Sequence, residues 1–370
     1  MKKPIRVSQI GSRGIPGHRG GVERVIEAIT PRLVASGFDI TVYCANWSKY
    51  RQASYLGVKL RYVYSIPTKY FDTFVRSLLS TLRDIVGPSD IIHFHGSGSA
   101  PLALLARLFG KKVVVTVHGL DWQRRKWSIF GRWFLTLGEY AAVKIPHRTV
   151  AVGQELKRAL DAQYGGSVVY IPNGVEQRPQ RAADKISQFG VGTRGYILYL
   201  ARLVPEKQCH VLIEAFKRLE TKNGLKLLIA GSAWHSAEYV ASLRALAGAD
   251  SDIAFLGEVD EALLEELYSN CYAYVLPSEV EGMSLSLLEA MAFGACIIAS
   301  DITANADLVG DSGLLFETGN AVDLSSKIQD IIADPDGAEE YRERALRRMT
   351  SEFNWDGISR QWGALYLGLS

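Results

Sequence analysis

The alternation of short apolar runs with helical segments is the feature that most constrains the fold of this chain. In the first half, runs rich in valine and isoleucine are separated by stretches whose apolar residues recur every three or four positions. Buried strands that alternate with helices predict a parallel sheet covered on both faces. We expect helices over 22–35 and 69–86, and strands over 5–10, 38–44, 58–64, 90–94, 112–117, 148–152 and 168–171.

This pattern breaks once and then restarts. Residues 176–194 contain glycine and proline but few apolar residues in register, which predicts a linker. The sequence therefore predicts an α/β protein of two doubly wound, Rossmann-like domains, 1–175 and 195–354, that face each other across a cleft. A last helix over 355–370 is expected to return to the first domain, and ligands are expected at the carboxyl ends of the strands. The strands of the second domain are expected over 196–200, 226–230, 253–256, 273–276 and 296–300.

Charge also divides the chain into two parts. The net charge of +3 conceals a basic half, residues 1–180, with 26 Lys and Arg against 11 Asp and Glu, and an acidic half with 16 against 28. The excess of +15 in the first half favours an anionic partner, such as a phosphorylated small molecule, a nucleic acid or an anionic membrane. Because the charges are dispersed and no recognised binding motif occurs, nucleic acid is not expected. A composition of 48% hydrophobic and 22% charged residues excludes a disordered chain.

The cysteines and the N-terminus indicate a cytoplasmic protein. The four cysteines are far apart and lie in apolar or helical contexts, which is typical of buried, reduced thiols. The first residues are basic but precede no long apolar run, so no secretory signal is expected. No apolar run reaches the roughly 18 residues that span a bilayer.

The strongest chemical signal is segment 277–294, which follows an expected strand and runs into a helix. Gly282 would let the backbone approach a ligand closely. The backbone amides that follow it would lie at a helix N-terminus, which attracts anions. These amides belong to Met283, Ser284 and Leu285.

Two carboxylates flank those amides. Glu281 precedes the helix and Glu289 follows about two turns later, so both could point toward the same ligand. The alternative is that Glu281 caps the helix and that Glu289 is a solvated helix residue. The apolar residues on both sides of Glu289 fit that alternative poorly.

A second motif, segment 199–207, follows the first strand of the second domain. Arg202 can hold an oxyanion through two parallel hydrogen bonds, and Lys207 adds a point charge. The alternative is that both are solvated charges at a helix start, or partners of Glu206.

Two further loops end strands of the first domain. Gly20 and Gly21 directly precede a helix, which is typical of a phosphate-binding turn, although neither the dinucleotide-binding fingerprint nor a P-loop occurs. His118 lies at another strand end. His93 and His95 share one strand face, but without a convincing third ligand we do not expect a metal. We interpret the D-x-D sequence at 250–252 as a solvated turn, because it lies at the wrong end of the sheet.

Taken together, these motifs resemble those of the family 4 glycosyltransferases, which have the GT-B fold. The resemblance covers nearly the whole chain, and it rests on Arg202 and Glu206-Lys207 occurring at the expected separation from Glu281-Gly282 and Glu289. The family transfers a sugar from a nucleotide diphosphate donor with retention of anomeric configuration, usually without a metal. The resemblance therefore implies a retaining, metal-independent hexosyltransferase with no bound cofactor and a nucleotide sugar as donor substrate.

The resemblance also implies roles for individual residues. Arg202 and Lys207 would hold the donor diphosphate, and Glu289 would accept hydrogen bonds from the ribose hydroxyls. Glu281 would lie near the donor sugar, with the amides after Gly282 completing the contacts. In the first domain, Gly21 would approach the diphosphate and His118 would contact the sugar.

The N-terminal half resembles a bacterial subgroup that includes rhamnosyltransferases of surface polysaccharide assembly. Segments 11–16, 20–23 and 118–127 carry this resemblance, whereas Gly17-His18 and Gln123 depart from the usual residues of the subgroup. The subgroup makes L-rhamnose the candidate sugar. The basic excess makes 1–175 the expected acceptor-side domain, with a saccharide linked to a lipid diphosphate as acceptor, and 195–354 the nucleotide-sugar donor domain. The competing interpretations are another GT-B enzyme, such as a nucleotide-sugar epimerase or a phosphorylase, and a non-enzymatic two-domain sugar-binding protein.

A peripheral position on the inner face of the plasma membrane is the last expectation. The helix that includes Lys69–Arg83 mixes aromatic residues with cations, which is typical of an interfacial helix. We favour the alternative of an ordinary amphipathic helix with its apolar face toward the core. A second candidate is the segment 124–133, which contains Arg124, Arg125, Lys126, Trp127, Arg132 and Trp133.

Overall fold

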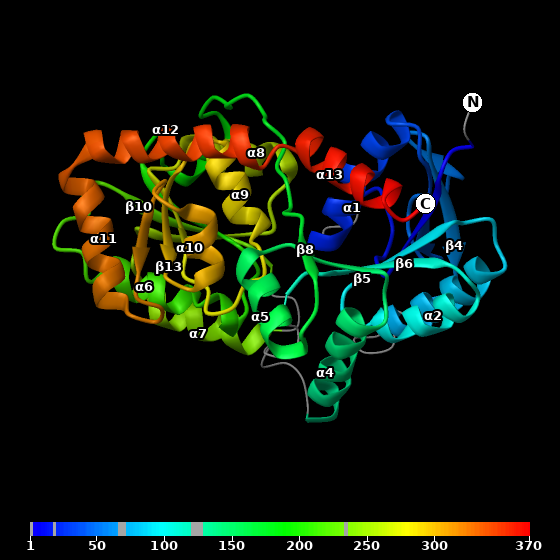
Figure 1. The fold of residues 1–370 in the computed structure, drawn as a ribbon. Coiled ribbons are helices and arrows are strands. Elements are labelled where there is room, and N and C mark those ends of the chain that lie inside the picture. The colour runs from blue at the N-terminus through cyan, green and yellow to red at the C-terminus, as the bar shows by residue number, and fades with distance from the viewer. Residues whose placement is uncertain (1–2, 18–19, 66–71, 120–128, 233–235) are drawn as a thin grey trace. The chain divides into compact units, whose positions relative to one another are not determined.

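The computed structural model describes residues 3–17, 20–65, 72–119, 129–232 and 236–370 of the 370-residue chain. The chain forms two compact units, shown as a ribbon in Figure 1. Unit 1 comprises residues 1–174 and 355–370, and unit 2 comprises residues 175–354. The net charge of +15 lies in unit 1 and that of −12 in unit 2.

Unit 1 is built on a sheet that has eight strands among the described residues, in the order β3-β4-β2-β1-β5-β6-β7-β8. All pairs are parallel except the short β3–β4 pair. β1 and β5 therefore lie side by side at the centre, where the strand order reverses. The strands are β1 Arg6–Ile10, β2 Asp39–Ala45, β3 Ser54–Tyr55, β4 Val58–Val63, β5 Ile91–His95, β6 Lys112–Val117, β7 Arg148–Ala151 and β8 Val168–Tyr170.

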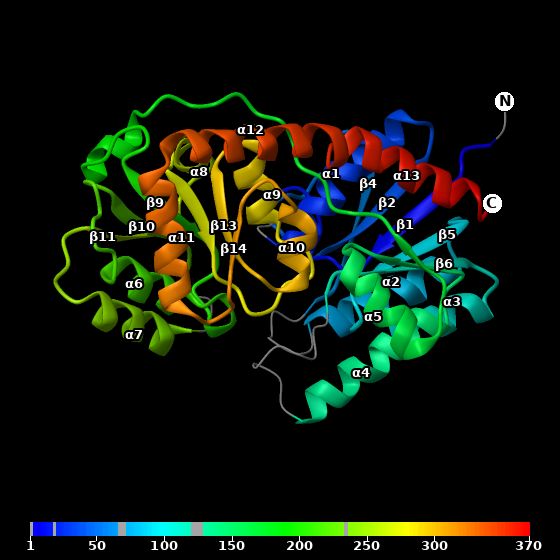
Figure 2. The ribbon, with the colours of Figure 1, turned by 60° about the vertical axis from the view of Figure 1, so that its left-hand side comes forward.

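Helices cover this sheet. The C-terminal helix α13 packs beside α1, and Figure 1 shows the two next to each other although they come from opposite ends of the chain. Figure 2 shows α2, α3, α4 and α5 near one another in the same unit. The described helices are α1 Gly21–Ala35, α2 Asp72–Ile85, η1 Ala100–Leu102, α3 Ala103–Leu108, α4 Ile129–Lys144, α5 Gln154–Tyr164 and α13 Trp355–Leu367.

Unit 2 has a parallel sheet of six strands among its described residues, in the order β11-β10-β9-β12-β13-β14. Two clusters of buried apolar side chains fill the space between this sheet and its helices. The strands are β9 Tyr196–Leu200, β10 Lys226–Ala230, β11 Ile253–Gly257, β12 Ala273–Leu276, β13 Cys296–Ser300 and β14 Leu314–Phe316. The helices are η3 Lys185–Phe189, η4 Pro205–Lys207, α6 Cys209–Lys217, α7 Ala237–Ala247, α8 Glu261–Asn270, α9 Leu285–Ala292, α10 Thr303–Val309, α11 Ala321–Ala333 and α12 Pro335–Glu352.

The predicted fold class of two doubly wound α/β domains is confirmed. The segment 176–194, however, is not a separate linker but part of unit 2. Ile186 is fully buried there, and its amide donates to Glu266 Oε1 at 2.9 Å. One buried residue in a polar stretch has no periodicity, so the sequence pattern did not reveal that this segment packs on α8.

Helix α2 reverses the expected amphipathic arrangement. Its buried residues are mostly polar, and the interpretation of an ordinary helix with its apolar face toward the core is therefore wrong. Asp84 explains the reversal, because it accepts hydrogen bonds from Ser8 Oγ at 2.8 Å and Tyr43 Oη at 3.0 Å. The sheet under α2 thus offers hydroxyl donors, and burying a carboxylate there is compensated by hydrogen bonds. The buried polar residues of α2 are Asp72, Arg76, Ser77, Ser80, Thr81 and Asp84.

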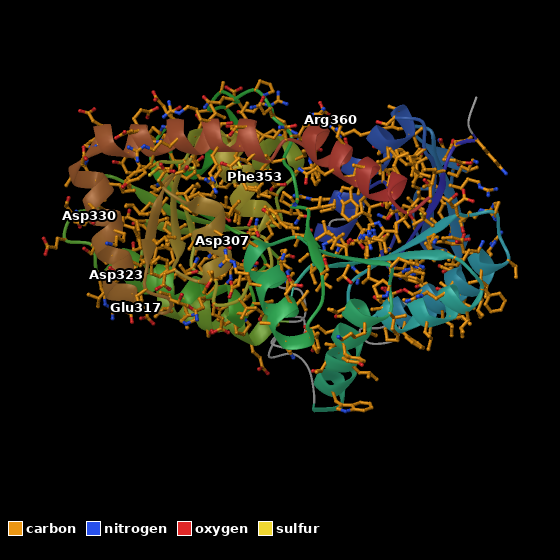
Figure 3. The ribbon with its side chains drawn as sticks, in the orientation of Figure 1. Asp307, Glu317, Asp323, Asp330, Phe353 and Arg360 are labelled. Carbon is orange, nitrogen blue, oxygen red and sulfur yellow. The ribbon has the colours of Figure 1, made fainter. Side chains whose placement is uncertain are left out.

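The acidic surface of unit 2 is visible on and around α10 and α11. Figure 3 labels Asp307, Glu317, Asp323 and Asp330 there, and the side chains of Glu317 and Asp330 are exposed. All four cysteines of the chain are buried and none forms a disulfide. None of the described helices is long and apolar enough to cross a lipid bilayer.

Candidate active site

The loops after two neighbouring strands of unit 2 bring Lys207 and Glu281 together. β9 and β12 pair in parallel, so their carboxyl ends lie at the same edge of the sheet. Lys207 Nζ forms an ion pair with Glu281 Oε1, and the two side chains are only 12% and 10% exposed. The amide of Glu279 donates to the carbonyl oxygen of Glu206 at 3.0 Å, which ties the same two loops through the backbone. A cation and a carboxylate held in this way are preorganised groups at the edge where ligands of such sheets bind.

Lys207 and Glu281 do not have the partners that the alternative interpretations gave them. Lys207 pairs with Glu281 rather than with Glu206. Glu281 does not cap the following helix, because Ser284 is the N-cap residue of α9 and its Oγ accepts from the Leu287 amide. Lys207 ends the short 3-10 turn η4, and α6 begins only at Cys209.

The predicted amides lie where the sequence places them, at the start of α9. Ser284 is the N-cap and Leu285 the first helical residue, and Met283 directly precedes them. The first amides of a helix have no partner within it, and the helix dipole places positive potential there. An anion site at this position stays a prediction.

Glu289 is half-buried on α9 and has a partner that the sequence did not indicate. Tyr268 Oη donates to Glu289 Oε2 at 3.2 Å. The interpretation of Glu289 as a solvated helix residue is therefore wrong. Tyr268 is fully buried on α8, so its ring is fixed and its hydroxyl orients the carboxylate.

A second tyrosine joins the same helix to the sheet. Tyr274 on β12 is fully buried, and its Oη lies 3.1 Å from the Leu200 carbonyl oxygen and 2.9 Å from Ser286 Oγ. Burial raises the pKa of Tyr274 well above its usual value, so this hydroxyl stays protonated. The contact links the end of β9 to the first turn of α9, and thereby the loop of Lys207 to the helix of Glu289.

In unit 1, Gly20 and Gly21 stand at the start of α1, as N-cap and first helical residue. A Cβ on Gly20 would lie 1.8 Å from Glu23 Oε2, so a side chain there would displace this carboxylate. Glu23 is buried, and its Oε1 accepts from the Arg13 amide at 2.9 Å. The carboxylate of Glu23 therefore ties Arg13, which follows β1, to α1.

His118 follows β6 and contacts His95 at the end of the neighbouring strand β5. His118 Nε2 lies 3.1 Å from His95 Nδ1, and the two rings are stacked. A Cβ on Gly11 would lie 2.5 Å from the carbonyl oxygen of His95, so the end of β1 also approaches this strand end closely. Burial lowers the pKa of His95 well below its usual value, so this imidazole is neutral at neutral pH.

The pair of acidic residues in the D-x-D sequence lies at a turn, as expected, but it is not simply solvated. Lys222 Nζ lies 3.2 Å from Asp250 Oδ2 and 2.8 Å from Asp252 Oδ2. Within the described residues, no group of three or more potential metal ligands comes together. Of the segments expected at a membrane, residues 66–71 and 120–128 lie outside the described part of the chain.

Two family models together match most of the chain. Residues 19–178 match the model "Glycosyltransferase Family 4", and residues 181–348 match the model "Glycosyl transferases group 1". The order of the two matches follows the two units. The chain belongs to the family 4 glycosyltransferases.

Curated relatives and solved structures agree with that family. This glycosyltransferase is 27% identical to an O-antigen chain mannosyltransferase B of Escherichia coli, over 52% of this chain and 50% of the relative. It is also 27% identical to a GDP-mannose-dependent alpha-(1-6)-phosphatidylinositol monomannoside mannosyltransferase of Mycobacterium tuberculosis, over 93% and 94% of the two chains. The fold is similar to that of the sucrose-phosphate synthase of Thermosynechococcus elongatus, with a TM-score of 0.86, 22% identity and 99% of both chains covered.

Proposed function

We propose that this GT-B glycosyltransferase moves a sugar from a nucleotide diphosphate to a saccharide acceptor with retention of configuration and without a metal. The Lys207–Glu281 pair at the ligand-binding edge of the unit 2 sheet carries the proposal. The cation Lys207 and the helix N-terminus at Ser284 and Leu285 both suit a diphosphate, and the carboxylate of Glu281 suits sugar hydroxyls.

The departing diphosphate sets the chemistry of the site. As the bond between the sugar C1 and the phosphate oxygen breaks, negative charge develops on the leaving group. Lys207 and Arg202, together with the amides after Gly282, stabilise that charge; Arg202 is exposed, whereas Lys207 is positioned before the reaction. Lys207 is already held by Glu281, so little reorganisation is required.

We assign no carboxylate as a covalent nucleophile. The acceptor hydroxyl attacks C1 on the face from which the diphosphate leaves, and its proton passes to the departing phosphate oxygen. One carbon–oxygen bond breaks and one forms on the same face, so the configuration is retained. Glu281 interacts with hydroxyls of the donor sugar in this scheme.

The remaining donor contacts are those that the family resemblance implies. Glu289, oriented by Tyr268, accepts hydrogen bonds from the ribose hydroxyls. Gly21 contributes the first amides of α1 to the diphosphate, and His118 contacts the sugar. Each contact is assigned to one unit and can be tested separately by mutation.

The acceptor is proposed to be linked to a lipid diphosphate, in cell-surface polysaccharide synthesis. The names of the two relatives refer to an O-antigen chain and to a phosphatidylinositol mannoside, and both are mannosyltransferases. The N-terminal resemblance instead favours L-rhamnose. Both sugars therefore belong in a donor screen.

A peripheral position on an anionic membrane is part of the proposal, and α2, α3 and α4 carry it. α2 buries its polar face, and Leu82 on this helix is 46% exposed; Val86, just after the helix, is 80% exposed. η1 contacts α2, α3 and α4, and α3 also contacts α2; Figure 2 shows α2, α3 and α4 in the same part of the unit. We call this area the α2–α4 surface. Its exposed apolar residues are Leu82, Val86, Leu104, Leu108, Phe109, Trp133, Leu137 and Tyr140.

Charge favours a membrane over another protein as the occupant of the α2–α4 surface. The carboxylates of these three helices are all turned inward, since Asp72, Asp84 and Glu139 are at most 4% exposed. Arg83 and Arg107 stay exposed beside the apolar residues. A surface that combines apolar side chains with unbalanced cations is complementary to anionic lipid headgroups.

The donor screen tests the catalytic proposal. Purified protein is incubated with UDP-glucose, GDP-mannose or dTDP-L-rhamnose and a saccharide linked to a lipid diphosphate, and products are identified by mass spectrometry. One donor should yield an acceptor heavier by one sugar, with the configuration retained by NMR, in the presence of EDTA. Conversion of the nucleotide sugar without an acceptor would instead support the epimerase alternative.

A further inference from the structure

A continuous line of hydrogen bonds runs through unit 1 from His118 to the C-terminal helix and back to the sheet. His118 Nε2 lies 3.1 Å from His95 Nδ1, and His95 Nε2 lies 2.7 Å from Gln9 Oε1. Gln9 Nε2 donates to Tyr366 Oη on α13 at 3.1 Å. Beyond it, His93 lies 2.7 Å from Tyr366 Oη through Nδ1 and 2.6 Å from Thr116 Oγ1 through Nε2.

The histidines inside this line cannot carry a charge near neutral pH. His93 and Gln9 are fully buried, and His95 is 3% exposed. Burial lowers the pKa of His93 to about 3 and the pKa of His95 well below its usual value. Each of these two rings therefore has one N–H and one lone pair, so it donates on one side and accepts on the other.

The amide of Gln9 sets the direction of the hydrogen bonds between Gln9 and His118. Its nitrogen faces Tyr366, so its oxygen faces His95 and requires a hydrogen on His95 Nε2. His95 Nδ1 is then an acceptor, and the hydrogen between the two rings belongs to His118 Nε2.

The same direction continues beyond Gln9. Tyr366 accepts from Gln9, and its own hydrogen can be donated to His93 Nδ1; His93 Nε2 then donates to Thr116. In this arrangement every member donates away from His118, and the orientation of the Gln9 amide fixes the two bonds between Gln9 and His118.

We propose that this line fixes the tautomer and ring orientation of His118, and that Tyr366 is a positioning residue for the active site. In the tautomer with its hydrogen on Nε2, His118 has an acceptor at Nδ1, the atom that we assign to a hydroxyl of the donor sugar. This last step rests on the proposed function; the tautomer itself does not.

The packing of α13 explains how Tyr366, although distant in sequence, can hold the line of hydrogen bonds that leads to His118. The ring of Tyr366 makes an edge contact with Phe38 at 5.9 Å, and Trp362 lies 4.8 Å from the ring of His93. The hydroxyl position is therefore determined by rings held in the core between α1 and the sheet. A positioned donor costs little entropy when the hydrogen bond forms.

The experiment records long-range proton–nitrogen correlation spectra of the full-length protein labelled with ¹⁵N-histidine. Wild-type His118, assigned by comparison with His118→Asn, should carry its hydrogen on Nε2 at pH 7.5. In Tyr366→Phe, His118 should sample both tautomers, and kcat should fall about tenfold with the KM for the donor within twofold, which corresponds to about 1.4 kcal/mol in the barrier.

Tyr43→Phe is the matched control. It also removes a buried tyrosine hydroxyl from unit 1, the one that donates to Asp84, but Tyr43 does not belong to the line. Its His118 signals and its kcat should stay as in the wild type. A hydrogen on Nδ1 of wild-type His118, or identical spectra and rates for Tyr366→Phe and Tyr43→Phe, would overturn the proposal. The wild-type spectrum tests the tautomer of His118 even if a variant fails to fold. This test does not depend on the turnover of any donor.

Discussion

Lys207 and Glu281 form a nearly buried ion pair across 74 residues of sequence. The pair depends on the parallel pairing of β9 with β12, which places the two following loops side by side. Neither charge is well solvated, so each one depends on the other for compensation in the absence of a ligand.

Removing Lys207 should affect both activity and stability. In Lys207→Ala, kcat/KM should fall by about 10²–10³, because the leaving diphosphate loses a preorganised cation. The free energy of unfolding of unit 2 should fall by about 3 kcal/mol, because Glu281 is left buried without its partner. Steady-state kinetics and urea unfolding measure the two effects.

Lys222→Ala is the control for that variant, since Lys222 also pairs with carboxylates, Asp250 and Asp252, but lies away from the site. It should retain nearly full activity. The double variant Lys207→Met/Glu281→Gln should regain most of the stability without regaining activity. Normal turnover by Lys207→Ala would remove this lysine from the diphosphate site.

Replacing Glu289 should weaken donor binding. In Glu289→Gln, the nucleoside diphosphate should bind about tenfold more weakly, since a charged acceptor of ribose hydroxyls becomes a neutral one. Tyr268→Phe should cause a smaller loss, because the carboxylate remains but is less well oriented. Titration calorimetry measures both, and equal affinity in Glu289→Gln and the wild type would contradict the assignment.

The α2–α4 surface should bind anionic vesicles. The wild-type protein should float with phosphatidylglycerol vesicles at low salt and not with phosphatidylcholine vesicles. Leu82→Ser/Val86→Ser/Leu108→Ser should lose at least tenfold in binding. Val322→Ser/Leu346→Ser, which replaces exposed apolar residues of unit 2, should float like the wild type. Absence of wild-type binding would count against membrane attachment.

The buried histidines make unit 1 sensitive to acid. Since the pKa of His93 is lowered to about 3 and that of His95 well below its usual value, the unfolded state binds more protons than the folded state below about pH 6.5. The free energy of unfolding of unit 1 should therefore not depend on these histidines above that pH. Below it, the free energy of unfolding should fall by about 1.4 kcal/mol per pH unit for each histidine. Hydrogen exchange of β5 and β6 peptides between pH 5 and 8, corrected for intrinsic rates, should show this loss.

The strands β9 and β10 of unit 2 provide the internal comparison for the acid response. They contain no histidine, and His210 on α6 is only half-buried. Their protection should change less between pH 5 and 8. An equal change in both units would show that His93 and His95 are not the cause.

Much of the fold could be predicted because buried strands have a plain signature. The bounds expected for β6, β9, β10, β12 and β13 coincide with those observed. β3 and β14 were missed, since two or three residues are too few to show a period. The direction in which α2 faces could not be predicted, because it depends on the hydroxyls of Ser8 and Tyr43 beneath it.

The sequence alone determined the two α/β units, the opposite charges of the two halves and the motifs around Lys207 and Glu289. It could do so because local periodicity and loop composition are properties of consecutive residues. Only the tertiary structure decided that Lys207 pairs with Glu281, that Tyr268 orients Glu289 and that Tyr366 connects to His118 through Gln9 and His95. Each of these contacts joins residues far apart in the chain, and their hydrogen bonds exist only once parallel strands and the returning C-terminal helix bring them together.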